Sequence, residues 1–190
     1  MEDEFERQFN SYFKKIQQLI ATLPVQDIRA TADLILEAYR NNNKIFVLGN
    51  GGSASNASHF ANEFNKGCAG GKKRFRVIAL VNDVPTITAW ANDMSYDDIF
   101  SEQLRNFVEK GDVVVGISSS GNSKNVLKAI RIAKDSGAKT IGLVGFSGGE
   151  LRNTVDVCIH IKDEHYGRTE DLHMMIFHYI GEYIRSSQGI

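Results

Sequence analysis

The sequence predicts an α/β protein: a five-stranded, mostly parallel sheet with helices on both faces, preceded by N-terminal helices. Short apolar runs alternate with longer amphipathic segments along the chain, which is the order expected of strands joined by crossover helices. The run DVVVGI at 112–117 is apolar nearly throughout, as is typical of a strand buried on both faces. Two of the runs end in Gly- and Ser-rich turns that open directly into helical segments, at 49–53 and 118–123.

Two helices are expected before the first strand. The first, at 3–22, carries large apolar side chains every three or four residues, and these form one stripe: Phe5, Phe9, Phe13, Ile16 and Ile20. The stripe must be buried, either on the core of its own domain or in a subunit interface. After Leu23-Pro24, residues 25–41 form the second helix.

The remaining elements follow in alternation. We expect strands at 44–48, 74–81, 112–117, 138–145 and 155–161. Helices are expected from the first Gly-rich turn to about residue 66, from the loop at 82–85 to residue 90, and at 96–109, 123–136 and 168–187. In the helix at 96–109 the apolar side chains expected to face inward are Ile99, Phe100, Leu104 and Phe107.

Composition narrows the class of protein. With 190 residues, 42% hydrophobic and 24% charged, the chain is expected to form one domain over residues 1–190 with a continuous core. The net charge of -1 argues against a nucleic-acid partner, and no apolar run reaches the roughly 18 residues needed to span a membrane. Cys68 and Cys158 lie far apart, and the acidic N-terminus is unlike a signal peptide, so we expect a cytoplasmic protein.

The first Gly-rich turn, Asn50-Gly51-Gly52-Ser53, predicts an anion site. Consecutive glycines allow a backbone to approach a ligand closely, and a serine at a helix start places hydroxyl and N–H donors at the positive end of the helix dipole. The same turn also fits the looser GxGxxA form of the dinucleotide fingerprint. That alternative lacks the acidic residue expected at the end of the next strand, which closes on Leu80-Val81-Asn82.

The second turn offers four hydroxyls: Ser118, Ser119, Ser120 and Ser123. Neutral hydroxyl and backbone donors suit a phosphate monoester, and the GxxxxGK[ST] pattern of a Walker loop is absent. The simpler alternative is a turn that only caps the next helix. Because ligands of parallel sheets bind beyond the carboxyl ends of the strands, the position after an apolar strand favours the anion site.

Titratable side chains on two helices form a candidate metal site. His59 and Glu63 are four residues apart and share one helix face, which suits two zinc ligands, although such a pair by itself is more often a solvated contact. The last helix adds Glu170, His173 and His178. His173 and His178 point at different angles, so one of the two histidines is free simply to pack.

The segments VLGNGGSASNASHFANEF and GISSSGNSKNVLKAI, with the spaced histidines of the last helix, resemble the sugar isomerase (SIS) domain family. Within that family the chain is most similar to the sedoheptulose-7-phosphate isomerase, or phosphoheptose isomerase, subgroup, which the segments at 91–93 and 98–101 also resemble. The resemblance implies a flavodoxin-like sandwich and a homotetramer with active sites at subunit interfaces. It also implies isomerisation of sedoheptulose 7-phosphate to D-glycero-D-manno-heptose 7-phosphate through an enediol(ate).

The resemblance also assigns roles. It implies zinc bound by His59, Glu63, Glu170 and His178, with Glu63 as the base and His178 as its acid partner. The phosphate would be held by the serines, namely Ser53, Ser118, Ser119, Ser120 and Ser123. The other substrate contacts would come from Asn50, Gly51, Gly52, Asn92, Asp93 and Glu170.

Two departures from the subgroup leave the substrate open. Glu170 stands where the subgroup has Gln, although a carboxylate also binds a divalent cation. The loop at 163–167 is shorter, and the acidic residue expected just before the last helix has no counterpart. The alternatives are therefore an isomerase of another sugar phosphate, or a non-catalytic SIS protein that senses sugar phosphates or acts as an adaptor.

Overall fold

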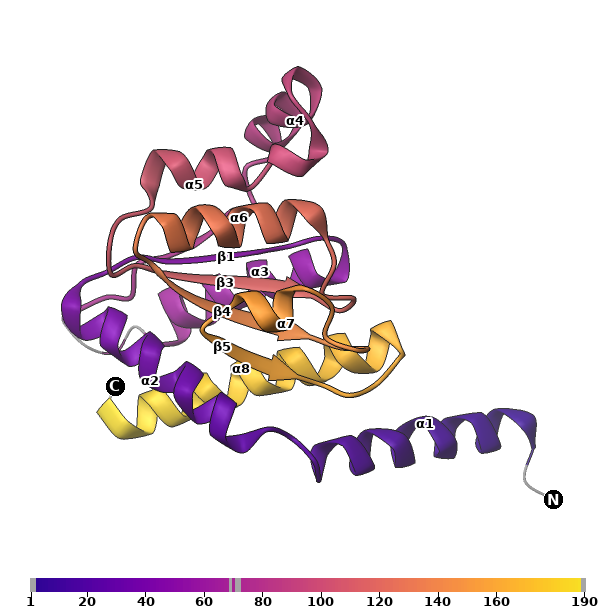
Figure 1. Cartoon of the computed structure of the whole chain (residues 1–190). Coiled ribbons are helices and arrows are strands. Elements are labelled where there is room, and N and C mark those ends of the chain that lie inside the picture. The colour runs from indigo at the N-terminus through magenta and orange to yellow at the C-terminus, as the bar shows by residue number, and fades with distance from the viewer. Residues whose placement is uncertain (1–2, 69, 71–72, 189–190) are drawn as a thin grey trace.

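The computed structural model describes residues 3–68, 70 and 73–188. Its centre is a five-stranded parallel sheet in the order β2-β1-β3-β4-β5, which confirms the predicted fold class (Figure 1). The strands are β1 (Ile45–Gly49), β2 (Val77–Ala79), β3 (Val113–Ser118), β4 (Lys139–Val144) and β5 (Val157–His160).

Helices cover both faces of this sheet. The α-helices are α1 (Glu4–Ile20), α2 (Val25–Asn41), α3 (Gly52–Asn62), α4 (Val84–Asp93), α5 (Ser101–Phe107), α6 (Lys124–Asp135), α7 (Leu151–Thr154) and α8 (Tyr166–Gln188). A π-helical turn, η1 (Glu63–Gly67), continues α3, and a 3-10 turn, η2 (Tyr96–Asp98), precedes α5. In Figure 1, α5 and α6 lie on one side of the sheet, and α2 and α8 lie on the other.

The two faces of the sheet have separate apolar cores. On β1, Ile45 and Val47 belong to the core shared with α2, α3 and α8, while Phe46 and Leu48 belong to the core shared with α5, α6 and α7. Successive side chains of a strand point to opposite faces, so an uninterrupted apolar strand supplies both cores. This is why the continuous apolar runs predicted the strands correctly.

Several predicted boundaries were wrong for local reasons. Helix α4 was expected to end at residue 90, but it begins on the Asp83 cap and continues through Asp93, with Met94 as its C-cap. The helix expected at 96–109 is divided into η2 and α5. Phe107 was expected to face inward, but it is the last residue of α5 and is 54% exposed. The short α7 was not predicted.

Helix α1 extends away from the layered body (Figure 1). Its predicted stripe is largely uncovered, since Phe5, Phe9 and Phe13 are 75%, 52% and 47% exposed. The Tyr12 hydroxyl donates a hydrogen bond of 2.8 Å to Asp171 Oδ2 and links α1 to α8. Within the part of the chain that the structure describes, the three phenylalanines of the stripe therefore have no core to pack on, whereas Ile16, closer to the end of α1, packs against the core of the sheet. Among the described residues, no helix is both long and apolar enough to cross a membrane.

Candidate active site

The two predicted anion turns meet at the carboxyl edge of the sheet. Strands β1 and β3 are neighbours with Gly49 opposite Ile117, so the turns that follow them emerge side by side. They enclose a pocket of about 160 Å³, which is lined by Asn50, Ser53, Ile117, Ser118, Ser119, Ser120, Ser123, Tyr166 and Glu170. Helices α3 and α6 both begin at this pocket, so their free N–H groups favour an anion there.

The serine side chains are set by hydroxyl contacts and by close backbone packing. Ser118 Oγ lies 3.0 Å from Ser123 Oγ and 3.5 Å from Ser120 Oγ. Ser119 Oγ is buried and has no hydrogen-bond partner among the described residues. Gly121 has a φ of +68°, and a Cβ there would lie 1.9 Å from the Gly148 carbonyl oxygen, so only glycine permits this turn. The hydroxyls are thus held in a compact group.

A small amide network holds Asn50. Its side chain and that of Asn125 exchange two hydrogen bonds of 2.9 Å, and the Tyr96 hydroxyl donates to Asn50 Oδ1 at 3.0 Å. Asn125 is 2% exposed. Neither Asn125 nor Tyr96 was among the site residues predicted from the sequence. The only signal for Asn125 was a polar side chain in the first turn of α6, at a position that proved to be buried.

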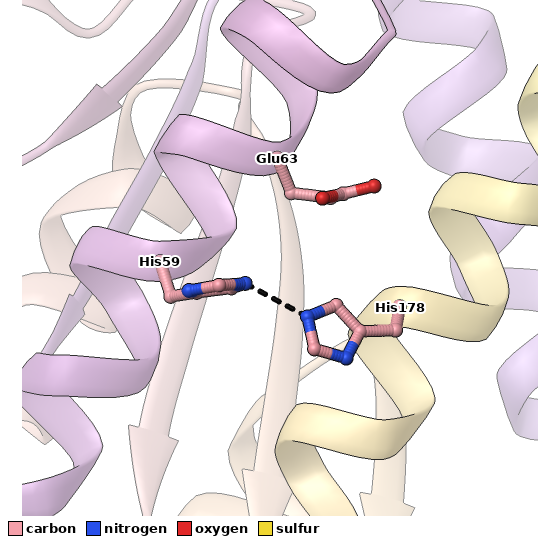
Figure 2. Close-up of side chains that lie close together, drawn as sticks. All are labelled: His59, Glu63 and His178. Atoms are coloured by element: carbon pink, nitrogen blue, oxygen red, sulfur yellow. Dashed lines mark hydrogen bonds between the residues drawn. The ribbon is translucent and has the colours of Figure 1, made fainter.

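His59, Glu63 and His178 converge from α3, η1 and α8 (Figure 2). Their candidate ligand atoms all lie within 4.8 Å of one another, and the two histidine Nε2 atoms are 2.7 Å apart. Two imidazoles and one carboxylate form the donor set of many catalytic zinc sites, so the residues fit a zinc ion. Glu63 opens the π-helical turn, a local distortion that is frequent at functional sites.

Arg185 completes the surroundings of Glu63. Its Nη1 donates a hydrogen bond to Glu63 Oε1, and its Nη2 donates one of 2.9 Å to Glu182 Oε2. The hydrogen bond to Glu63 raises the pKa of Arg185, with a further contribution from Glu182. Arg185 is 122 positions from Glu63 in the chain and was not among the site residues predicted from the sequence.

Similarity to known proteins identifies the family of this chain. The pattern of the SIS domain matches residues 8–145. The chain belongs to the SIS domain family. It is 38% identical to the phosphoheptose isomerase of Helicobacter hepaticus over 189 residues, which cover 100% of this chain and 95% of that one.

Two solved structures extend the SIS comparison. The phosphoheptose isomerase GmhA from Neisseria gonorrhoeae superposes with a TM-score of 0.89 at 31% identity, covering 96% of this chain and 99% of that one. The phosphoheptose isomerase from Francisella tularensis gives 0.88 at 30% identity, covering 94% and 96% of the two chains. Nearly the whole chain therefore shares the fold of these enzymes.

Within this SIS fold, Glu170 lies apart from the other expected metal ligands. It lines the serine pocket, and a Cβ added to Gly52 would lie 2.1 Å from its Oε2, so the carboxylate rests against the start of α3. Burial raises the pKa of Glu170, and the nearby Asp171 raises it further. The structure thus brings three of the four predicted ligands together and places the fourth beside the predicted phosphate site.

The other predicted residues are placed as follows. Gly51 has a φ of +54° and Gly52 begins α3, so both form the turn beside the pocket. Asn92 and Asp93 lie at the exposed end of α4, where the Asn92 amide donates to Asp93 Oδ1 at 2.8 Å, and they are not among the residues that line the pocket. His173 is fully buried. Of the two histidines on α8, it is therefore the one that packs.

Proposed function

We propose that this SIS-domain protein is an enzyme, a phosphoheptose isomerase that interconverts sedoheptulose 7-phosphate and D-glycero-D-manno-heptose 7-phosphate. The observation that carries the proposal is the cluster of His59, Glu63 and His178 between the same two helices, α3 and α8, that border the serine pocket. Relatives with this name at 38% and 31% identity over nearly the whole chain support it.

The separation of the two groups of residues suits a long substrate. Ser53 and His59 are six residues apart on α3, or about 9 Å along the helix axis. In sedoheptulose 7-phosphate the phosphate is on C7, whereas the reacting carbons, C1 and C2, are at the other end of the molecule. A phosphate held by the serines would therefore orient distant carbons, and this fixed orientation lowers the barrier to reaction.

In the proposed reaction, Glu63 removes a proton from C1 of the ketose, and the electron pair forms the C1–C2 double bond of an enediol(ate). His178 moves a proton from O1 to O2, and Glu63 returns its proton to C2, which leaves the aldehyde at C1. Each positioned acid or base contributes on the order of 10²–10⁴ in rate. A zinc ion held by His59, Glu63 and His178 would polarise the carbonyl oxygen.

The proposal extends to assembly and location. We place the active protein in a homotetramer, with sites at subunit interfaces, because the aromatic stripe of α1 is exposed in the single chain. An apolar groove of about 470 Å³ near α8 supports the same idea, since its lining includes Met175, Tyr179 and Tyr183. The free Cys68 and Cys158 suit a cytoplasmic location.

The test is turnover of sedoheptulose 7-phosphate by the zinc-supplemented protein, followed by NMR. Wild type should produce the aldose 7-phosphate, and Glu63→Gln should not. The matched control is Glu37→Gln, at an exposed position of α2, which should behave like wild type. No turnover by folded wild type would exclude the proposed function, and turnover by Glu63→Gln would exclude Glu63 as the base.

Glu170 favours a second candidate, isomerisation of a different sugar phosphate. Its carboxylate in the serine pocket alters the surface offered to the substrate, compared with the Gln of the resembled subgroup. A panel of shorter sugar phosphates in the same assay decides between the two. A higher kcat/KM on a shorter substrate than on sedoheptulose 7-phosphate would favour the second candidate.

A further inference from the structure

Glu63 is enclosed on two sides by backbone that has no side chain. A Cβ added to Gly67, at the end of η1, would lie 3.1 Å from Glu63 Cδ. A Cβ added to Gly181, on α8, would lie 2.8 Å from Glu63 Oε1. The backbone of α8 therefore passes directly beside this oxygen, and the space around the carboxylate is closed on that side.

Arg185 lies one turn after Gly181 on α8 and binds the same oxygen. The side chains of Glu63 and Arg185 are 16% and 27% exposed, so the pair is partly withdrawn from water. The second arm of the guanidinium is bonded to the exposed Glu182. The guanidinium is planar and presents its donors as a rigid fork, so a single side chain reaches both carboxylates.

These contacts affect the two oxygens of Glu63 unequally. Oε1 accepts the Arg185 hydrogen bond and lies against Gly181, whereas no hydrogen bond to Oε2 is present among the described residues. Gly67 does not distinguish the two oxygens, since a Cβ added there would lie 3.1 Å from Oε1 and 3.2 Å from Oε2. A free carboxylate rotates and presents either oxygen. Here the rotation is restrained from one side, and a restrained ligand binds a metal better than a mobile one.

We propose that Arg185 is a positioning residue: by holding Glu63 Oε1, it leaves Oε2 as the oxygen that binds the metal ion and moves the substrate proton. The catalytic part of this proposal depends on the proposed isomerase function, whereas the metal-binding part does not. The simpler explanation is an ion pair that only fastens α8 to α3. The two explanations differ in what happens to metal affinity and kcat in protein that remains folded.

The experiment compares wild type with Arg185→Gln, Arg185→Lys and Glu182→Gln. Zinc affinity is measured without sugar, by competition with a chromophoric chelator, and kcat and KM are measured with sedoheptulose 7-phosphate. We expect Arg185→Gln to weaken zinc binding and lower kcat by about 10- to 100-fold, the range typical for partners of metal ligands. KM should change by less than about twofold, because the phosphate is bound by the serine turn on other elements.

The conservative variant and the control separate position from charge. Arg185→Lys keeps the positive charge but lacks the planar fork, so it should recover only part of the lost zinc affinity. Glu182→Gln removes charge from the exposed partner and should stay within about twofold of wild type. In a Glu63→Gln background, Arg185→Gln should have no further effect on zinc affinity, because the residue it positions is already altered.

The outcomes distinguish this proposal from the proposed function. If wild type does not isomerise the sugar but Arg185→Gln weakens zinc binding in a Glu63-dependent way, the positioning role stands and the isomerase function does not. If wild type is active and folded Arg185→Gln retains both zinc affinity and kcat, the positioning role is refuted and the function stands. A lower thermal midpoint with unchanged affinity and kcat also refutes it, since that result is expected of a structural ion pair.

Discussion

Acid should destabilise this protein partly through His173. The side chain is fully buried on α8, and its Nε2 donates to the Val144 carbonyl oxygen at 3.3 Å. Its Nδ1 is buried without a partner among the described residues. Burial lowers the pKa of His173 from 6.5 to about 4, and the hydrogen bond to Val144 only partly offsets that effect.

The sign and size of the effect follow from linkage. The unfolded chain protonates this histidine below about pH 6.5, but the folded protein does so only below about pH 4. Stability that is present above pH 6.5 is therefore lost as the pH falls through this window. The contribution of His173 to the free energy of unfolding is roughly 3 kcal/mol in total, and about 2 kcal/mol of it should be lost between pH 7 and pH 5.

The assay is chemical denaturation of wild type and His173→Gln at pH 8, 7, 6 and 5, at one protein concentration. The glutamine amide can still donate to the Val144 oxygen but does not titrate in this range. The free energy of unfolding should change with pH in the same way for both proteins from pH 8 to 7. Between pH 7 and pH 5, wild type should lose about 2 kcal/mol more of its free energy of unfolding than the variant. If the free energies of unfolding of the two proteins fall in parallel down to pH 5, the reasoning is refuted, whatever the difference between them at pH 7.

Three further predictions concern the pocket and the assembly. Gly52→Ala places a methyl group 2.1 Å from Glu170 Oε2, which is the end of a flexible side chain, so we expect the carboxylate to move aside at a cost of about 1 kcal/mol or less in denaturation; a loss above about 3 kcal/mol, recovered when Glu170 is also changed to Ala, would show that the carboxylate cannot move. Ser123→Ala removes a hydroxyl 3.0 Å from Ser118 Oγ and should raise KM about tenfold with a smaller change in kcat; an unchanged KM would place the phosphate elsewhere. Phe9→Lys should lower the mass of the assembly measured by light scattering and leave the helix content measured by circular dichroism unchanged. A variant that remains a tetramer would show that the α1 stripe is not an interface.

The sequence predicted the sheet well because the strands are short, apolar and buried on both faces, which is a strong local pattern. It predicted the ends of α4 and α5 poorly, because these ends depend on local caps and because an apolar side chain near a helix end is not always buried. Phe107 illustrates this: apolar spacing alone placed it inward, whereas it lies at the last residue of α5, where the chain turns away.

For the site, local spacing accounts for only part of the geometry. The four-residue separation of His59 and Glu63 placed them on one face, and the Gly- and Ser-rich turns were recognisable from composition. The approach of Arg185 to Glu63, and the position of Glu170 against Gly52, depend on how α8 crosses α3. No pattern within either helix determines that crossing, so these contacts required the structure.

The composition of the serine pocket has a consequence for how its affinity would vary with pH. None of the described residues that line it is a lysine, an arginine or a histidine, so the attraction for an anion comes from hydroxyls and from the first turns of α3 and α6. Those donors do not titrate in the physiological range. Apart from Glu170, the group whose ionisation governs binding would then be the ligand itself, since a phosphate monoester takes its second negative charge near pH 6. Such a pocket responds to the charge state of its ligand while its own donors stay constant.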